Sequence, residues 1–510
     1  MSVIRIPVLG MAVVLAGGSA WAGVKLASPF ADGMVLQRDR EVAVWGTADA
    51  GEKVKVSFAG NEVEATADAQ GAWRVNLPKM AASKEGRVLT ARSVGASDDA
   101  DISVQTISDV LVGEVWFCCG QSNTELPLVG GNPHFSDRQG RLVAQMTRKP
   151  HVRCAYASDY RFSGEPRKVA PYPVAWKPFM PEVLGTAPSF SAMGVYFALE
   201  LYSALDVPVG IVGSYWGGTN IDAWTPREGY QNRPELKDVA DWKFVPEAEW
   251  TDACKKGPVN GKQQQPGVLW NEMVAPWCPM TMRGFIWYQG CHNGGESDRY
   301  CAKMHALYDG WSKNFENPEL KLYFVQLAPF SSSWWGLQLA QAQFAAEEKN
   351  AALVTTVDIG NGADVHPNEK GTIGKRLAAL ALRHDYGFTD LVADAPTLRG
   401  VCSEEGRLIM SFKDAKGWYV YSPDWSTDCG FEVAGPDGVW QKAYLVNANG
   451  GAKKSVPWQT KGMVEGRDLI LAADGVEKPM KVRYLYNRPW VGTVYADSGL
   501  PLGPFSAEVK

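Results

Sequence analysis

Residues 110–119 are apolar on both alternating faces, apart from two positions. This pattern is typical of a central strand that helices cover from both sides. The run stops at Gly120 and is followed by the polar residues Gln121, Ser122 and Asn123. Such a strand would carry a serine hydroxyl to the edge where open α/β sheets bind their ligands. The serine could equally serve as an N-cap or a turn residue.

Between residues 109 and 392, apolar strand patterns alternate with helical patterns. The strand patterns cover residues 110–119, 207–214, 284–289, 322–327 and 352–358. The helical patterns cover residues 192–205, 300–314, 337–349 and 369–382. This alternation predicts an α/β fold with a mostly parallel sheet, helices on both faces and right-handed crossovers. Two intervals, 129–191 and 225–279, are rich in Gly, Pro and Trp and are expected to be loops or insertions around a site.

Shorter β patterns flank this region on both sides. Residues 24–108 contain strand patterns at the spacing of a small sandwich, separated by turns that contain glycine. Residues 393–510 return to β patterns, as a further β domain or as a β layer against the α/β region. We therefore predict an N-terminal β-sandwich (23–108), a catalytic α/β domain with loop insertions (109–392) and a C-terminal β domain (393–510).

The N-terminus has the pattern of an export signal. Arg5 precedes an apolar run over residues 6–16, and Ala20 and Ala22 form a small-x-small motif that predicts cleavage after Ala22. The run is too short to span a bilayer, and no later segment approaches the required length of about 20 residues. We expect a signal peptide over residues 1–22 and a secreted or periplasmic protein without a membrane span.

Composition narrows the range of partners. The chain of 510 residues has a net charge of −5 with interspersed charges, so nucleic acid is not an expected partner. Its 20 tryptophans suit either sugar stacking or core packing. The nine cysteines permit up to four disulfides in an oxidising compartment, and the sequence does not tell their pairing or the oligomeric state. They include no Cys-x-x-Cys pair, so neither a structural metal site nor a cofactor is expected.

Four of the five strand patterns end in a polar cluster. These clusters are residues 120–123, 215–220, 289–293 and 358–367. Because the carboxyl ends of parallel strands lie at one edge of a sheet, we expect the four segments to converge there. A serine, a histidine, an aspartate, glycines and side-chain amides would then meet, and acyl transfer from an ester requires these groups.

Ser122, His366 and Asp364 are the candidate catalytic residues. A serine hydroxyl needs a base to take its proton, and neutral histidine is the usual base near pH 7. Asp364 precedes His366 by two residues, so both project to the same side of an extended segment, which Pro367 favours. Asp364 would then orient the imidazole. Alternatively, this segment is merely a loop that enters the next helix.

The tetrahedral intermediate of ester hydrolysis needs hydrogen-bond donors, each commonly worth about 3–4 kcal/mol. The backbone amides of Ser122, Gly217 and Gly218 are candidates, because glycine permits close backbone approach. A side-chain amide, from Gln289 or Asn293, could supply the last donor. Alternatively, the two glycines form only a turn and Gln289 satisfies the end of a strand.

Four segments resemble those of a known family. They read Gly-Gln-Ser-Asn (120–123), Ser-Tyr-Trp-Gly-Gly-Thr (214–219), Trp-Tyr-Gln-Gly (287–290) and Asp-Val-His-Pro-Asn-Glu-Lys (364–370). They resemble the blocks of the SGNH-type carbohydrate acetylesterases, and of the sialate O-acetylesterases in particular. The resemblance implies an SGNH-hydrolase-like (flavodoxin-like) parallel sheet. It also implies that Ser122 is the nucleophile, His366 the base and Asp364 the residue that orients the base.

Three positions depart from the pattern of that family. Cys291 and His292 stand where the family usually has Glu and Ser, and Thr124 stands in place of Met. Gln121 and His292 are candidates for substrate contact, although His292 could equally be a packed substitute. Cys291 could pair with Cys301 or remain free.

The sequence therefore predicts a metal-independent serine esterase that removes O-acetyl groups from acetylated sialic acid or a sialoglycan. One alternative is an acetylesterase that acts on xylan or another acetylated polysaccharide. Another is a carbohydrate-binding protein that has lost turnover, because the third block is altered.

Overall fold

The chain divides into two compact units. Of the residues that the structure describes, the first unit takes those within 23–27, 44–77 and 89–106, and the second takes those within 28–43, 78–88 and 107–509. The computed structural model describes residues 23–94, 103–130, 132–157, 160–170, 173–184, 190–246, 249, 261–331, 334–420, 428–446, 463–465, 468–487 and 494–509. The predicted signal peptide lies outside these residues. Among the described residues, no helix has both the length and the apolar composition needed to cross a membrane.

The first unit consists of short β-strands. β1 (Lys25–Leu26), β3 (Val42–Thr47) and β6 (Ala72–Leu77) form a three-stranded sheet. β4 (Lys53–Phe58) pairs with β5 (Asn61–Thr66) and β7 (Ser83–Ser93) in antiparallel fashion. Every second residue of β4 and of β6 is buried, as expected for strands with one face on a core.

The second unit is built around a mixed sheet with the strand order β10-β9-β11-β8-β12-β13-β14. The five strands that match the predicted patterns are β8 (Val104–Gly120), β11 (Val209–Tyr215), β12 (Gly284–Tyr288), β13 (Lys321–Val325) and β14 (Ala351–Val354). They pair in parallel, and β2 (Val35–Gln37) adds a further parallel pairing to β8. From residue 110 onward β8 is buried throughout, as expected of a central strand covered on both faces.

Two strands of this sheet come from the interval 129–191, where the sequence pattern predicted loops or insertions. β9 (Lys149–Tyr156) pairs in parallel with β11, and β10 (Trp176–Phe179) pairs antiparallel with β9. The pattern hid β9 because Pro150, His151 and Arg153 interrupt its apolar residues. Arg153 is nevertheless buried, because its guanidinium forms an ion pair of 2.8 Å with Asp109.

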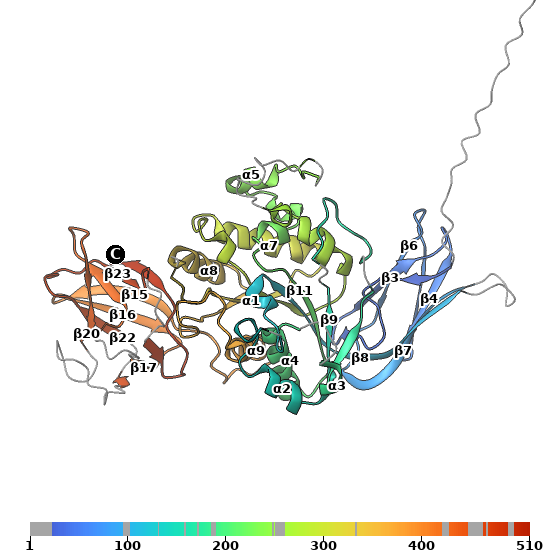
Figure 1. The fold of residues 1–510 in the computed structure, drawn as a ribbon, viewed down its shortest axis with the longest axis horizontal. Coiled ribbons are helices and arrows are strands. Elements are labelled where there is room, and N and C mark those ends of the chain that lie inside the picture. The colour runs from blue at the N-terminus through green and yellow to red at the C-terminus, as the bar shows by residue number, and fades with distance from the viewer. Residues whose placement is uncertain are drawn as a thin grey trace, which may run out of the picture. The chain divides into compact units, whose positions relative to one another are not determined.

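Four long helices cover the sheet. They are α4 (Ala192–Leu205), α7 (Tyr300–Asn314), α8 (Trp335–Glu347) and α9 (Lys370–Asp385), close to the predicted helical ranges. α4 packs against α9 and α7 against α8, and the two pairs lie on opposite faces of the sheet (Figure 1). Gly374 lets α9 approach α4, because a Cβ there would lie 2.5 Å from the Cβ of Tyr196. Short helices in the two insertions include α2 (Gly140–Met146), α3 (Pro181–Leu184) and α5 (Lys237–Ala240).

Three small β-sheets form the C-terminal part of the second unit. The first sheet contains, in spatial order, β15 (Thr397–Glu404), β16 (Arg407–Lys413), β22 (Asp468–Ala472) and β20 (Tyr444–Leu445). The second contains β21 (Met463–Glu465), β17 (Gly417–Val420) and β24 (Val494–Ala496). The third contains β19 (Trp440–Lys442), β18 (Phe431–Ala434), β23 (Lys481–Tyr484) and β25 (Phe505–Glu508). Phe412, Trp418, Phe431 and Tyr484 are buried in their shared core.

Candidate active site

The candidate nucleophile lies at the end of the central strand. Gly120 ends β8 and pairs with Tyr215 of β11 on one side and Tyr288 of β12 on the other. Its φ is +141°, and a Cβ there would lie 2.4 Å from the carbonyl oxygen of Tyr288, so the turn requires glycine. The chain then enters α1 (Ser122–Glu125), whose first residue is the serine. Ser122 therefore stands at the carboxyl edge of the parallel strands.

The structure brings Ser122, His366 and Asp364 together. The Oγ of Ser122 lies 2.8 Å from Nε2 of His366. Nδ1 of His366 lies 3.7 Å from Oδ1 of Asp364, and the same oxygen accepts a hydrogen bond of 2.9 Å from the backbone amide of His366. The carboxylate thus holds the backbone of the histidine more closely than its ring. This order of carboxylate, imidazole and hydroxyl can activate a serine.

The surroundings of His366 favour its neutral form. Burial lowers the pKa of His366, the charge of Lys370 lowers it further, and Asp364 acts in the opposite direction. The Phe135 ring meets the imidazole edge to face, with ring centroids 5.2 Å apart. The histidine is therefore neutral near pH 7 and able to accept a proton.

A buried lysine joins the segment of the serine to the segment of the histidine. Lys370 begins α9, and its Nζ donates a hydrogen bond of 2.6 Å to Oδ1 of Asn123. Asn123 in turn donates from Nδ2 to the carbonyl oxygen of Val365, at 2.9 Å. The ammonium also lies 5.0 Å from the centroid of the Tyr288 ring. Burial lowers the pKa of Lys370 to about 7. Nothing in the local sequence pattern shows that the side chain of Lys370 is buried, so its role could not be predicted from the sequence.

The glycines proposed as oxyanion donors lie in the loop that follows β11. A Cβ on Gly217 would lie 3.3 Å from the Cβ of Ser122, so this loop runs beside the candidate nucleophile. The amide of Gly217 donates a hydrogen bond of 2.6 Å to Oε2 of Glu125, whose other oxygen accepts from the hydroxyl of Tyr160 at 2.5 Å. Gly218 has a φ of +69° and open space at its Cα. Glu125 therefore contacts this loop, and the sequence did not predict that contact.

The side-chain amides proposed as further donors hold the segments together. Both amide hydrogens of Gln289 are engaged, by the carbonyl oxygen of Thr219 at 3.0 Å and by Oδ1 of Asn293 at 2.7 Å. Tyr300 donates to Oε1 of Gln289 at 2.7 Å. Asn293 accepts from the amide of Ile221 at 3.1 Å. In this arrangement Gln289 and Asn293 connect the end of β12 to the loop after β11.

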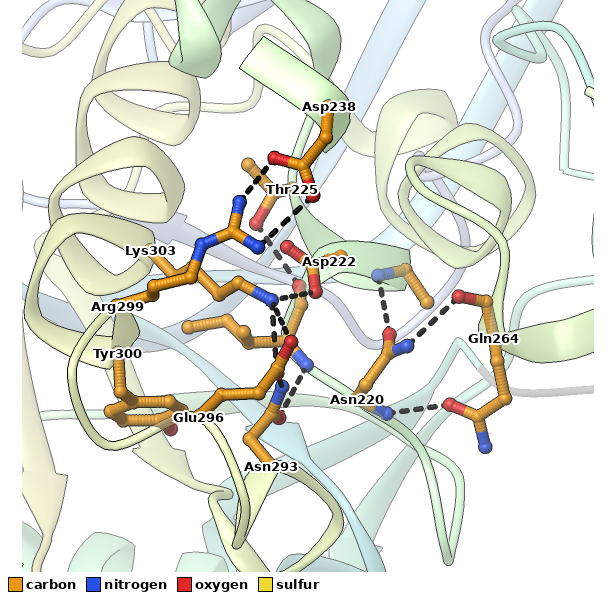
Figure 2. A network of polar contacts seen from close by, with 12 residues as sticks. Asn220, Asp222, Thr225, Asp238, Gln264, Asn293, Glu296, Arg299, Tyr300 and Lys303 are labelled. Atoms are coloured by element: carbon orange, nitrogen blue, oxygen red, sulfur yellow. Dashed lines mark hydrogen bonds and ion pairs between the residues drawn. The ribbon is translucent and has the colours of Figure 1, made fainter. Parts of the chain in front are cut away.

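Three charged side chains also connect the loop after β11 and the turn after β12 to α7 (Figure 2). Nζ of Lys303 in α7 lies 2.6 Å from Oδ2 of Asp222 and 2.8 Å from Oε1 of Glu296. Glu296 also accepts a hydrogen bond of 2.5 Å from Nδ2 of Asn293. Burial lowers the pKa of Lys303, but the two carboxylates outweigh burial and the net shift is upward. Lys303 is therefore charged, and it fixes the loop after β11 and the turn after β12 to α7.

The remaining predicted site residues lie beside this network. Gln121 is buried, and its Oε1 accepts a hydrogen bond of 3.1 Å from the amide of Gly290. His292 is half-buried, and burial lowers its pKa. Cys291 and Cys301 are both free, so the pairing considered for them is absent. Burial raises the pKa of Cys291 to about 12, and the nearby Lys370 acts in the opposite direction.

A family model described as "Carbohydrate esterase, sialic acid-specific acetylesterase" matches residues 112–383. The chain belongs to this family. The match spans all four segments of the site and confirms the resemblance stated from the sequence. Membership makes the protein a carboxylic ester hydrolase.

Individual relatives agree with the family match. The esterase is 28% identical over 448 residues to the sialate O-acetylesterase of Rattus norvegicus, covering 76% of this chain and 79% of that one. It is 27% identical over 428 residues to the sialate O-acetylesterase of Homo sapiens, covering 76% and 77%. It is similar to the crystal structure of a carbohydrate acetylesterase from Xanthomonas citri, with a TM-score of 0.78 and 28% identity, covering 96% of this chain and all of that one.

Proposed function

We propose that the esterase removes O-acetyl groups from sialic acid with Ser122 as nucleophile, His366 as general base and acid, and Asp364 as the group that orients the histidine. The observation that carries this proposal is the 2.8 Å contact between Oγ of Ser122 and Nε2 of His366. A serine hydroxyl and an imidazole at hydrogen-bond distance form the pair that acyl transfer requires.

The reaction proceeds in two halves. Oγ of Ser122 attacks the acetyl carbonyl carbon as Nε2 of His366 takes its proton, and the protonated imidazole then gives that proton to the departing sugar oxygen. In the second half, Nε2 of His366 takes a proton from a water molecule, whose oxygen attacks the carbonyl carbon of the acetyl-serine. The bond from that carbon to Oγ of Ser122 then breaks, acetate leaves, and the imidazolium returns the proton to Oγ. The amides of Ser122 and of the 217–218 loop are the proposed donors to the oxyanion, and Gly217 becomes a donor only when Glu125 releases its amide.

Several wider features belong to the same proposal. The fold is of the SGNH type, with a catalytic domain over residues 109–392. Residues 1–22 are a signal peptide, and the mature enzyme is secreted or periplasmic. The names of the relatives and of the family favour acetylated sialic acid over other acetylated carbohydrates.

Acetate release tests both the mechanism and the substrate. The parent enzyme and Ser122→Ala are compared on 9-O-acetyl sialic acid and on acetylated xylan. We expect release from the sialic acid, and a loss of roughly 10⁴-fold or more in the variant. Equal rates in variant and parent would reject the serine mechanism. Release by the parent from xylan alone would leave the serine mechanism in place and reject the sialate assignment.

A further inference from the structure

A second group of reactive side chains lies away from Ser122, between α7 and α8. Cys301 and His305 are four residues apart in α7, so they project from the same face of the helix. Glu347, the last residue of α8, reaches both of them. Its Oε2 lies 2.9 Å from Nε2 of His305 and 3.5 Å from Sγ of Cys301. The three possible ligand atoms all lie within 4.8 Å of one another.

The two distances from Oε2 of Glu347 are close to those of a tetrahedral zinc site. Bonds of about 2.0 Å to nitrogen or oxygen and about 2.3 Å to sulfur, at the tetrahedral angle, separate oxygen from sulfur by about 3.5 Å and oxygen from nitrogen by about 3.3 Å. Thiolate and imidazole ligands favour zinc over magnesium or calcium, and two ligands at i and i+4 of a helix are a recurrent zinc-binding spacing.

We infer that Cys301, His305 and Glu347 form a site for Zn²⁺ or a similar borderline divalent cation, with a fourth position open to water. Gln343 donates a hydrogen bond of 2.9 Å to the other oxygen of Glu347 and so orients the carboxylate. The ring of Phe344 meets the His305 ring edge to face at 4.7 Å between centroids. Both supporting residues lie in α8.

Metal binding requires a deprotonated thiol. The thiol proton of Cys301 is released to solvent, and His305 binds the cation through an Nε2 that carries no proton. Burial and the charge of Glu347 raise the pKa of Cys301 to about 12, whereas Arg233 acts in the opposite direction. Arg233 is itself paired with Asp309 at 2.5 Å. A bound cation offsets the repulsion between the thiolate and the carboxylate.

The position of this site gives it a structural role. Nε2 of Gln341 in α8 donates a hydrogen bond of 3.3 Å to the carbonyl oxygen of Gln289, and the hydroxyl oxygen of Tyr300 in α7 lies 3.1 Å from the same carbonyl oxygen. A cation held between Cys301 and Glu347 ties together the two helices that support the end of β12. The site contains none of the residues proposed for ester hydrolysis, so it stands or fails independently of the proposed function.

Cobalt binding tests the inference directly. The full-length protein is stripped with chelator and titrated with Co²⁺ and then Zn²⁺, alongside Cys301→Ser and His305→Gln. We expect one equivalent of Co²⁺ to produce a thiolate-to-cobalt charge-transfer absorption that Zn²⁺ removes. Cys301→Ser should abolish this absorption, and His305→Gln should weaken binding at least 10-fold. Zn²⁺ should also raise the thermal midpoint of the parent and leave that of Cys301→Ser unchanged.

Matched variants separate this site from adventitious binding. Cys402 is exposed, and His384 is bonded to Asp394 at 2.9 Å in another part of the chain. Cys402→Ser and His384→Gln should both bind Co²⁺ like the parent. Absence of the absorption in the parent, its persistence in Cys301→Ser, or its loss in Cys402→Ser would each overturn the inference.

Discussion

At the scale of single residues, the protonation of the candidate base depends on its burial and on a buried lysine beside it. Lys370 is fully buried and His366 is partly buried, and burial favours the neutral form of both. Lys370 also acts on His366 through its charge and, through Asn123, on the position of Val365. The lysine therefore influences both the proton affinity and the placement of the candidate base.

Replacing Lys370 with Met should change the pH dependence of the reaction. In the parent, kcat/KM falls at acid pH as His366 becomes protonated. Because the pKa of His366 is lowered, this fall occurs at a pH below the ordinary pKa of histidine. Lys370, with a pKa of about 7, is mostly charged in that range. Its removal raises the pKa of His366, so the acid limb should move to higher pH. Loss of the Asn123 contact should also lower kcat by roughly 10- to 100-fold.

Lys375→Met is the matched control for this pH shift. Lys375 lies in the same helix, but its side chain is 63% exposed and contacts Glu200 at 3.8 Å. The control should retain the pH profile and the kcat of the parent. Identical acid limbs in Lys370→Met and the parent would show that the lysine does not act on the base.

At the scale of elements, the site is made of turns that follow parallel strands, and helices hold those turns from outside. The Gly120 turn ends β8, and the segment after β11 is bonded to the segment after β12 through Gln289. α7 anchors both of these segments through Lys303 (Figure 2). A substitution that shifts one of these turns should therefore also shift the others.

Gly120→Ala should destabilise the second unit. The left-handed φ costs a residue with a Cβ about 1–3 kcal/mol, and the contact with the Tyr288 carbonyl oxygen adds to that cost. Urea unfolding measures the loss. Gly387→Ala is the control, because Gly387 has a φ of +78° but open space around it. A control that loses as much stability as Gly120→Ala would assign the whole effect to φ and none to the close contact.

Lys303→Met should leave the carboxylates of Asp222 and Glu296 without their buried cation. Breaking such a pair by removing one partner costs about 3–5 kcal/mol. The free energy of unfolding should therefore fall by about that amount, and esterase activity should fall with it because the loop after β11 loses its anchor. Lys313→Met, at an exposed position of the same helix, should change stability by less than about 0.5 kcal/mol. Equal stability of the two variants would contradict the proposed role of Lys303.

At the scale of the whole molecule, noncovalent packing holds together the part of the second unit that the structure describes. The described cysteines, Cys118, Cys119, Cys154, Cys278, Cys291, Cys301, Cys402 and Cys429, are all free. Burial raises the pKa of the Cys154 thiol to about 12, so this thiol is also poorly reactive. The sequence permitted up to four disulfides, and the structure forms none among these eight residues.

A reducing agent should therefore leave the thermal midpoint of the esterase unchanged. The measurement compares unfolding with and without dithiothreitol, in metal-free buffer so that the inferred cation site does not contribute. Thiol titration of the unfolded protein under non-reducing conditions should find all nine cysteines reactive. A lower midpoint in reductant together with missing thiols would show that cysteines pair in the protein as it is made.

Periodicity in the sequence was enough to predict the α/β sheet, the four long helices and the edge at which the polar segments meet. Those features follow from how each segment divides its residues between water and the interior, which is a local property. The same reasoning placed Ser122, His366 and Asp364 in one site, because strand ends and the two-residue spacing are visible in the chain.

Only the tertiary structure decided which groups lie opposite one another. β9 contains Pro150 and Arg153, yet it is a strand of the sheet because its backbone pairs with that of β11. The amide of Gly217 meets Glu125, Lys370 meets Asn123, and Lys303 meets Asp222 and Glu296 across 81 and seven residues. A local pattern shows which side of a segment is buried, but the partner of a buried charge is set by how distant segments pack.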